Sequence, residues 1–145
     1  MRFETRRLSV ETPEGIGVVN ITPQIRDMLA EAGLRQGFVV VSSNHTTTAL
    51  AINENEERLL DDFRNFFSTL VPANLRYKHN DIHLRDCPED EPENAHSHIM
   101  AVLLGSSESI PVDQGALQLG EWQSVLLFEL DGPRSREVKV QLVGE

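Results

Sequence analysis

The sequence is poor in cysteine, in basic residues and in long apolar runs, and each shortage excludes a class of protein. One cysteine in 145 residues cannot form an intrachain disulfide, so a reducing compartment is expected. Thirteen Lys and Arg against 23 Asp and Glu give a formal net charge of −10, which makes nucleic acid and anionic membranes poor partners. The longest apolar run, residues 99–104, is far shorter than a membrane span, and residues 1–10 lack the apolar core of a signal peptide. We therefore expect a cytoplasmic protein with neither of these partners.

What the sequence contains fits one α+β domain over residues 1–145, because this length supports a single core and no repeat is visible. Apolar patterns predict strands at residues 3–11, 16–21, 38–41, 96–104, 108–112, 122–130 and 137–143. Helical spacing predicts two main helices, at residues 22–33 and 53–70, and a long loop follows at residues 73–93. We expect a largely antiparallel or mixed β-sheet sandwich in which the first two strands form a hairpin and the last ones a meander.

Two histidines stand at the head of the longest apolar run. Since residues two apart on a strand point to the same face, the predicted strand would present His96 and His98 side by side. The other three, His45, His79 and His83, lie in loops or at element ends and can converge on this pair. Imidazole suits zinc and related ions, and a three-histidine set leaves one coordination position open. The histidines therefore predict a metal site, with strand capping or backbone hydrogen bonding as the alternative.

Polar groups near the last predicted turn offer an anion site. Arg134 lies in this turn, and its guanidinium can bind a phosphate or a carboxylate, although a plain surface arginine is the alternative. Ser106 and Ser107 can add hydroxyls and backbone amides. Glu129 lies in an apolar strand, so it either faces water or meets a cation such as Arg134. A raised pKa would make Glu129 a general base.

Weaker candidates surround these residues. Cys87 can act as a soft metal ligand, and a carboxylate of residues 89–93 can orient an imidazole, unless this acidic run is simply solvated. Trp122 is expected in the core or in a subunit contact. The chain has no P-loop, no Gly-x-Gly-x-x-Gly motif and no nucleophile elbow, which excludes nucleotide-binding and α/β-hydrolase folds.

Several ordered motifs resemble the YjbQ-like family. They are NHTTTALAINEN at residues 44–55, YKH at 77–79, AHSH at 95–98, LLGSS at 103–107, and a closing run at 110–138 that includes LGEWQ, ELDGPR and REV. The resemblance spans nearly the whole chain. It implies a small α+β domain, typically a homotrimer, with a histidine-rich site that can hold a metal.

The resemblance also implies the activity of a secondary thiamine-phosphate synthase, which joins a pyrimidine-methyl diphosphate to a thiazole phosphate with loss of diphosphate. By resemblance, His45, His79 and His98 are the metal ligands, and Glu129 and Arg134 belong to the closing motif of the site. His96 is an additional histidine that departs from the family pattern.

On this hypothesis a divalent ion, zinc or magnesium, acts with Arg134, Ser106 and Ser107 to hold the leaving diphosphate or the acceptor phosphate. Zinc suits the imidazoles, whereas diphosphate chemistry commonly uses magnesium. Two alternatives stay open: metal-dependent hydrolysis of a small substrate, and a trimeric metal-binding or ligand-binding module without catalysis.

Overall fold

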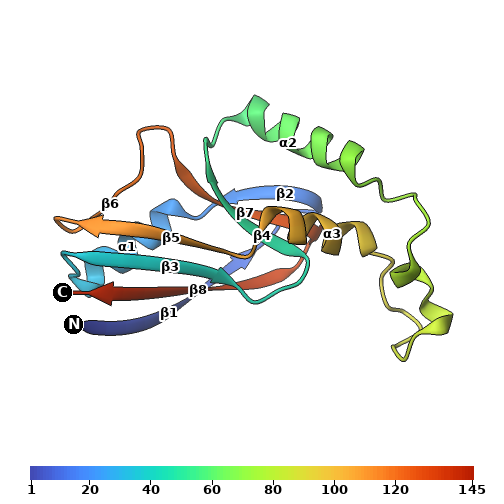
Figure 1. The fold of residues 1–145 in the computed structure, drawn as a ribbon, viewed down its shortest axis with the longest axis horizontal. Coiled ribbons are helices and arrows are strands. Elements are labelled where there is room, and N and C mark those ends of the chain that lie inside the picture. Colours follow the sequence, from blue (N-terminus) through green and yellow to red (C-terminus); the bar gives the residue numbers. More distant parts are fainter.

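Eight strands and three α-helices follow one another in a computed structural model that describes residues 1–145 (Figure 1). The strands are β1 (Arg2–Glu11), β2 (Gly15–Asn20), β3 (Gly37–Ser43), β4 (Thr48–Asn53), β5 (Ser107–Asp113), β6 (Ala116–Leu117), β7 (Ser124–Gly132) and β8 (Ser135–Gly144). The helices are α1 (Thr22–Ala32), α2 (Glu57–Leu70) and α3 (Ala95–Leu104), with short 3₁₀ helices η1 (Lys78–Asn80) and η2 (Ile82–Leu84). This is the small α+β domain that the sequence predicts. None of the helices combines the length and the apolar character that crossing a bilayer requires.

The strands form two antiparallel sheets. The larger has the order β1-β8-β3-β5-β6 and the smaller has the order β2-β7-β4. The predicted hairpin of the first two strands is therefore wrong, because β1 pairs with β8 and β2 pairs with β7. The predicted meander is wrong for the same reason, since β7 and β8 follow each other in sequence but lie in different sheets. An alternating pattern identifies a strand and its buried face, but it does not identify the partner strand.

Strand β7 is buried on both faces and separates two apolar clusters. Val125 and Leu127 belong to a cluster of 17 buried residues that draws on both sheets and on α1. Leu126 and Phe128 belong to a smaller cluster, against which side chains of α2 and α3 pack. A strand covered on both faces reads as a continuous apolar run, which β7 has. Glu129 continues the same alternation. It therefore lies on the face of β7 that carries Val125 and Leu127 and that is directed toward the larger cluster.

Residues 96–104, predicted as a strand, form most of helix α3 instead. A short continuous apolar run has no period, so it does not distinguish a buried strand from a buried helix. Ala, Met and Leu, which fill much of α3, are strong helix formers, and the helix stops at Gly105, whose φ is 95°. Residues two apart are separated by about 200° around a helix, so His96 and His98 do not share a face.

Strand β4 and the start of α2 also differ from the expectation. Residues 48–53 pair with β7, so α2 begins after this strand, at Glu57 rather than at Asn53. The Glu56 carboxylate accepts hydrogen bonds from the backbone N–H groups of Arg58 and Leu59, at 3.0 and 2.7 Å, and so fixes the helix start. The long loop expected at residues 73–93 contains the two 3₁₀ helices η1 and η2. Trp122 precedes β7 and is 69% exposed, so it is not part of the core.

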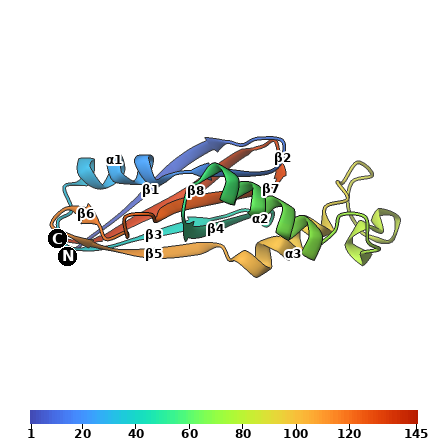
Figure 2. The same ribbon diagram turned by 90° about the horizontal axis from the view of Figure 1, so that it is seen from above.

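The two ends of the domain carry different elements. The chain termini lie together at the end that also carries α1, whereas the segment with η1 and η2 extends from the opposite end (Figure 2). The loop between β3 and β4 and the N-terminal half of α3 lie toward this second end (Figure 1). Most of the predicted site residues are therefore gathered away from the termini.

Candidate functional site

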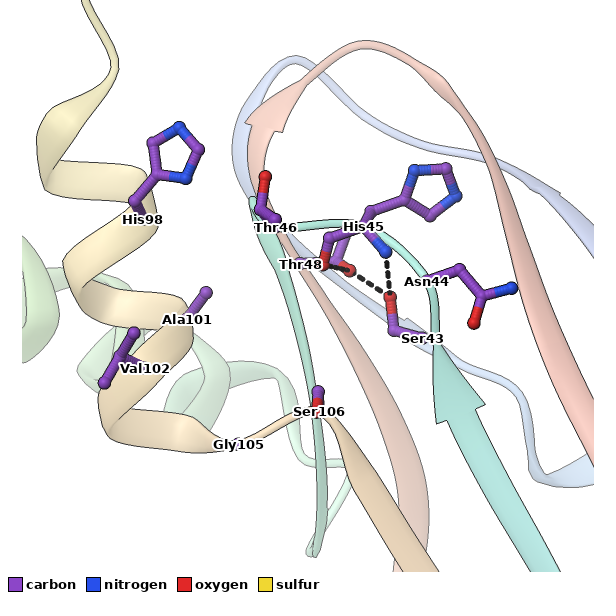
Figure 3. Close-up of a pocket in the computed structure, with 10 residues that line it drawn as sticks. All are labelled: Ser43, Asn44, His45, Thr46, Thr48, His98, Ala101, Val102, Gly105 and Ser106. Atoms are coloured by element: carbon purple, nitrogen blue, oxygen red, sulfur yellow. Dashed lines mark hydrogen bonds between the residues drawn. The ribbon is translucent and has the colours of Figure 1, made fainter. Parts of the chain in front are cut away.

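Two adjoining hollows open where the β3–β4 loop meets α3. Both are lined by the same four residues, Asn44, His45, Thr46 and His98. The first, about 550 Å³, continues along α3 to Gly105 and Ser106, and we call it the α3 hollow (Figure 3). The second, about 410 Å³, continues to the end of β7 and the start of β8, and we call it the arginine hollow. Its further lining residues are Thr47, Glu91, Pro92, Asn94, Arg134 and Arg136.

Backbone hydrogen bonds hold the β3–β4 loop beside the end of α3. The N–H of Ser43, the last residue of β3, donates to the carbonyl of Ser106 at 2.9 Å. The N–H of Leu50, in β4, donates to the carbonyl of Gly105 at 3.0 Å. The turn between α3 and β5 is thereby joined to both strands that flank the loop. These contacts explain why the polar loop and the helix line one cavity.

His79 and His98 come together, as expected, at the junction of η1 and α3. Their ring centroids are 4.7 Å apart, with an angle of 74° between the rings. His79 Nε2 is buried and has no hydrogen-bond partner. Burial lowers the pKa of His98, and the nearby His79 lowers it further, while the carboxylate of Asp131 acts in the opposite direction. The lowered pKa favours the neutral imidazole of His98, the form that binds metals and transfers protons.

His45 lines both hollows, but its ring is held by another element. The backbone N–H of Glu137, at the start of β8, donates to His45 Nε2 over 3.0 Å. An imidazole nitrogen that accepts this bond has its lone pair engaged, so the neutral ring carries its proton on Nδ1. The ring points away from α3 and from His98 (Figure 3). His45 therefore belongs to the cavity wall without joining the His79–His98 pair.

The three histidines expected as metal ligands are only partly arranged to bind a metal ion. No group of three or more His, Cys, Asp or Glu side chains is arranged to hold a metal. His79 and His98 fit as two ligands, because one has an unpartnered buried nitrogen and the other a lowered pKa. His45, the third expected ligand, is occupied by β8 through Nε2. The expected set is thus reduced to a histidine pair within one chain.

The remaining histidines and the cysteine do not converge on this pair. His96 lines neither hollow, which follows from the helical conformation of α3. His83 and Cys87 line a separate hollow with Glu89 and Glu93 in the segment before α3. Of the three histidines that could converge on His96 and His98, only His79 packs against one of them. The polar segment before α3 has little apolar periodicity, so its path could not be predicted from pattern alone.

The two serines and Arg134 have different positions relative to the hollows. Ser106 lines the α3 hollow, whereas Ser107 begins β5 and lines neither hollow. Arg134 lines the arginine hollow and donates to Asp131 twice, from Nη2 to the carboxylate and from Nε to the carbonyl, both at 2.9 Å. No hydrogen bond involves Arg134 Nη1. One edge of this half-exposed guanidinium is thus fixed while the other remains for a ligand.

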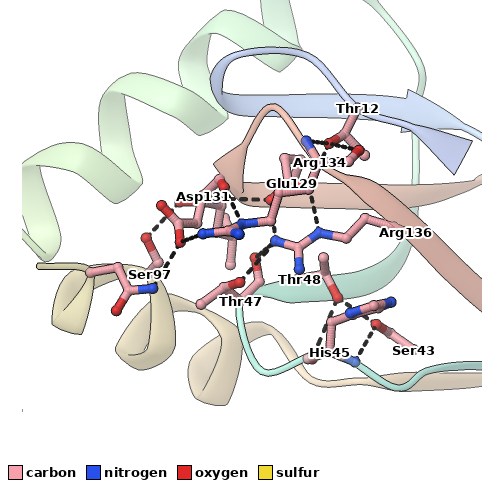
Figure 4. A network of polar contacts seen from close by, with 12 residues as sticks. Thr12, Ser43, His45, Thr47, Thr48, Ser97, Glu129, Asp131, Arg134 and Arg136 are labelled. Carbon is pink, nitrogen blue, oxygen red and sulfur yellow. Dashed lines mark hydrogen bonds and ion pairs between the residues drawn. The ribbon is translucent and has the colours of Figure 1, made fainter. Parts of the chain in front are cut away.

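Glu129 meets Arg136 rather than Arg134 (Figure 4). Arg136 Nε and Nη2 donate to its two carboxylate oxygens at 2.7 and 2.6 Å, and Thr12 Oγ1 donates at 2.6 Å. The N–H of Asp131 adds a bond at 2.9 Å. Burial raises the pKa of Glu129, but the hydrogen bonds from Arg136 and Thr12 outweigh it, so the net pKa is lowered. The raised pKa that a general base would need is therefore absent, because the buried carboxylate is fully hydrogen-bonded and charged; Glu129 meets a cation, as one alternative had it, but the cation is Arg136.

Arg136 is the site residue that the sequence analysis missed. Its Nη2 also donates to Thr47 Oγ1 at 2.8 Å, so it links Glu129 to the β3–β4 loop (Figure 4). A signal was present in the sequence. Arg136 shares the inward face of β8 with Val138 and Val140, as Glu129 shares that of β7 with Leu127. Two opposite charges at inward strand positions indicate a buried pair.

Comparison with known proteins gives consistent matches over the chain. The family model described as "UPF0047 protein YjbQ-like" matches residues 6–145. A UPF0047 protein of Methanothermobacter thermautotrophicus is 39% identical over 145 residues, covering 100% of this chain and 95% of its own length. One of Archaeoglobus fulgidus is 40% identical over 134 residues, covering 92% of this chain and 97% of its own length.

Solved structures agree with these relatives. A YbjQ-like protein of unknown function from Sulfolobus solfataricus has a TM-score of 0.89 and 31% identity, over 99% of each chain. A hypothetical protein from Aeropyrum pernix has a TM-score of 0.89 and 37% identity, over 98% of this chain and 99% of its own. The fold described above is thus shared with experimentally determined structures.

Proposed function

Because the chain belongs to the UPF0047 YjbQ-like family, we propose that it acts on a small phosphorylated molecule in the two adjoining hollows. The reaction proposed is thiamine-phosphate synthase-like transfer, in which the ring nitrogen of the thiazole phosphate forms a bond to the pyrimidine-methyl carbon, while diphosphate leaves that carbon with the electron pair of the broken carbon–oxygen bond. One observation carries this proposal. Arg134 and the neutral imidazole of His98 line the same cavity, which therefore has groups for binding an anion and for exchanging a proton.

Arg134 is the proposed anion-binding residue. Its guanidinium is oriented by two bonds to Asp131 and keeps one nitrogen without a partner in the hollow. An oriented guanidinium binds phosphate with little loss of side-chain freedom. Ser106, in the neighbouring hollow, is the proposed second contact for a phosphorylated substrate. Stabilising the charge on a leaving diphosphate is the main help that such a transfer needs.

Glu129 has a positioning role in this proposal. It is fully buried and charged, so it does not reach a substrate and does not act as a base. Through Arg136 it fixes Thr47, the last residue of the β3–β4 loop. Since His45 lies in the same loop, Glu129 keeps the cavity wall in one conformation.

A divalent ion would bind at His79 and His98. Imidazole nitrogens suit zinc better than magnesium, which prefers oxygen ligands. When bound, such an ion supplies positive charge that neutralises a developing diphosphate. His45, the third ligand that the resemblance implies, would have to exchange its bond to β8 for the metal.

A homotrimer in the cytoplasm completes the proposal. Helix α3 contains no charged residue, and Val102 and Leu103 on its outer side are 83% and 59% exposed. Residues 99–104 of this helix are apolar on every side, and such a segment is normally buried, so a neighbouring subunit is the expected cover. The single cysteine agrees with a reducing compartment.

Purified protein can be assayed directly for thiamine phosphate formed from the two phosphorylated substrates. Wild type should form product, whereas His98→Ala and Arg134→Gln should lose at least tenfold in rate, about the effect of one charge-stabilising group. His96→Ala is the matched control, because it removes an imidazole from the same helix outside both hollows. Unchanged rates in His98→Ala and Arg134→Gln would overturn the proposed site, and binding of the substrates without any product would favour a non-catalytic module.

A further inference from the structure

One residue that lines the arginine hollow carries a buried hydrogen-bond acceptor that no protein group satisfies. Asn94 is 6% exposed and lines this hollow. Its Nδ2 donates to the Asp131 carboxylate at 2.8 Å, which fixes the orientation of the amide, because a flipped amide would turn its oxygen toward a carboxylate. Asn94 Oδ1 is left buried without a partner. Buried acceptors are normally satisfied, so this oxygen indicates a donor that arrives with a ligand.

Asn94 does not cap its helix, although it stands at the capping position. Asn94 is the N-cap of α3, a position where asparagine commonly binds the first backbone N–H groups of the helix, yet its side chain makes no capping bond. Asn80 performs part of that task, since its Oδ1 accepts from the N–H of Ala95 at 3.1 Å. Another segment thus caps the helix, and the Asn94 side chain lies beside Asp131 in the hollow.

Glu91 adds a second acceptor to this hollow. It is half-buried, and its carboxylate makes no ion pair or side-chain hydrogen bond. The two guanidiniums of the hollow do not neutralise the charge of Glu91, because Arg134 is paired with Asp131 and Arg136 with Glu129. These two pairs are formally neutral, which leaves the charge of Glu91 in excess. The unmatched groups of the hollow are therefore acceptors, while Arg134 Nη1 remains as a donor.

We propose that the arginine hollow selects a phosphate ester that also carries an amino or other N–H group. The phosphate would bind Arg134, and the N–H group would donate to Glu91 and to Asn94 Oδ1. Glu91 is then a specificity-determining residue, since it repels a ligand that is only anionic and attracts one that presents a donor. This inference rests on the proposed function, and it names the substrate class of the same site.

A matched pair of probes tests this selection. 2-Aminoethyl phosphate and ethyl phosphate differ only in the amino group, and their dissociation constants can be measured by calorimetry at pH 7. Wild type should bind the amino ester roughly tenfold more tightly, as expected for one charge-assisted hydrogen bond. Glu91→Gln should weaken binding of the amino ester and tighten binding of ethyl phosphate, so that the ratio approaches one. A merely structural effect would move both constants in the same direction.

Two further variants separate the possible outcomes. Glu89→Gln is the control, because Glu89 lies in the same acidic segment but lines a different hollow, and it should leave the ratio unchanged. Arg134→Gln should weaken both esters. Equal wild-type affinity for the two esters, with both weakened in Arg134→Gln, would overturn the selection and leave the anion site intact. If neither ester binds to wild type, both the selection and the proposed function are wrong.

Discussion

The carboxylate of Glu129 and the guanidinium of Arg136 form a two-bond ion pair across the two sheets, at 2.6 and 2.7 Å. Glu129 lies in β7 of the smaller sheet and Arg136 in β8 of the larger one. Neither side chain is more than 5% exposed. The turn between β7 and β8 thus crosses from sheet to sheet around a buried charge pair. Because Arg136 also holds Thr47, stability and the shape of the cavity depend on the same contact.

Breaking this pair should be costly. Glu129→Gln leaves the buried Arg136 charge without its partner, which typically destabilises a protein by about 3–5 kcal/mol. The free energy of unfolding in urea at pH 7 measures the effect. Glu137→Gln is the control, since that carboxylate is 41% exposed and lies 3.8 Å from the exposed Arg7. It should change stability by less than about 1 kcal/mol. A loss in Glu129→Gln no larger than in the control would contradict a stabilising role for the pair.

The stability that Glu129 contributes should depend on pH with a defined sign. Its pKa is lowered in the folded protein from an ordinary value of 4.5. Its contribution is therefore fully present above the unfolded pKa and is lost as the pH falls through the lowered folded pKa. Urea unfolding of wild type and Glu129→Gln from pH 7 to pH 3 should give a difference that is constant above about pH 5 and decreases below it. A difference that grows as the pH falls would show the opposite shift.

The pKa of His98 should respond to its neighbour. Burial, and secondarily the proximity of His79, lower it below 6.5. His79→Ala removes both a covering side chain and a nearby charge, so the pKa of His98 should rise toward 6.5. Titration of the imidazole proton signals by NMR, with a chelator present, measures the change. His83→Ala is the control, because His83 is exposed and lines a different hollow. Equal pKa values for His98 in both variants would contradict this coupling.

The outer side of α3 should control the proposed assembly. A charge at Val102, which is 83% exposed, would have to be buried in a subunit contact there. Val102→Glu should therefore convert the trimer to monomers, as measured by analytical ultracentrifugation. Leu84→Glu introduces the same charge at a position that is 74% exposed on η2 and should leave the assembly unchanged. A wild-type chain that sediments as a monomer would overturn the trimer itself.

Local patterns predicted several elements well. The alternating residues of β1 and β8 and the apolar stripe of α1, which Pro23 begins and Gly33 ends, carry their conformation in the nearby sequence. The run at residues 99–104 has no period, so its conformation was decided by packing against β4 and β7. That single difference separated His96 from His98 and left His98 beside His79, two of the three ligands that the family resemblance implies.

The sequence by itself determined the class of the domain, its charge and the chemical groups from which a site can be built. Which of these groups meet was decided only by the tertiary structure. Arg136 reaches Glu129 because two strands adjacent in sequence enter different sheets, and β8 holds His45 because it pairs with β3. The first contact joins residues only seven apart in sequence and the second residues 92 apart, but both depend on which strands pair, whereas periodicity describes only the face on which each residue lies.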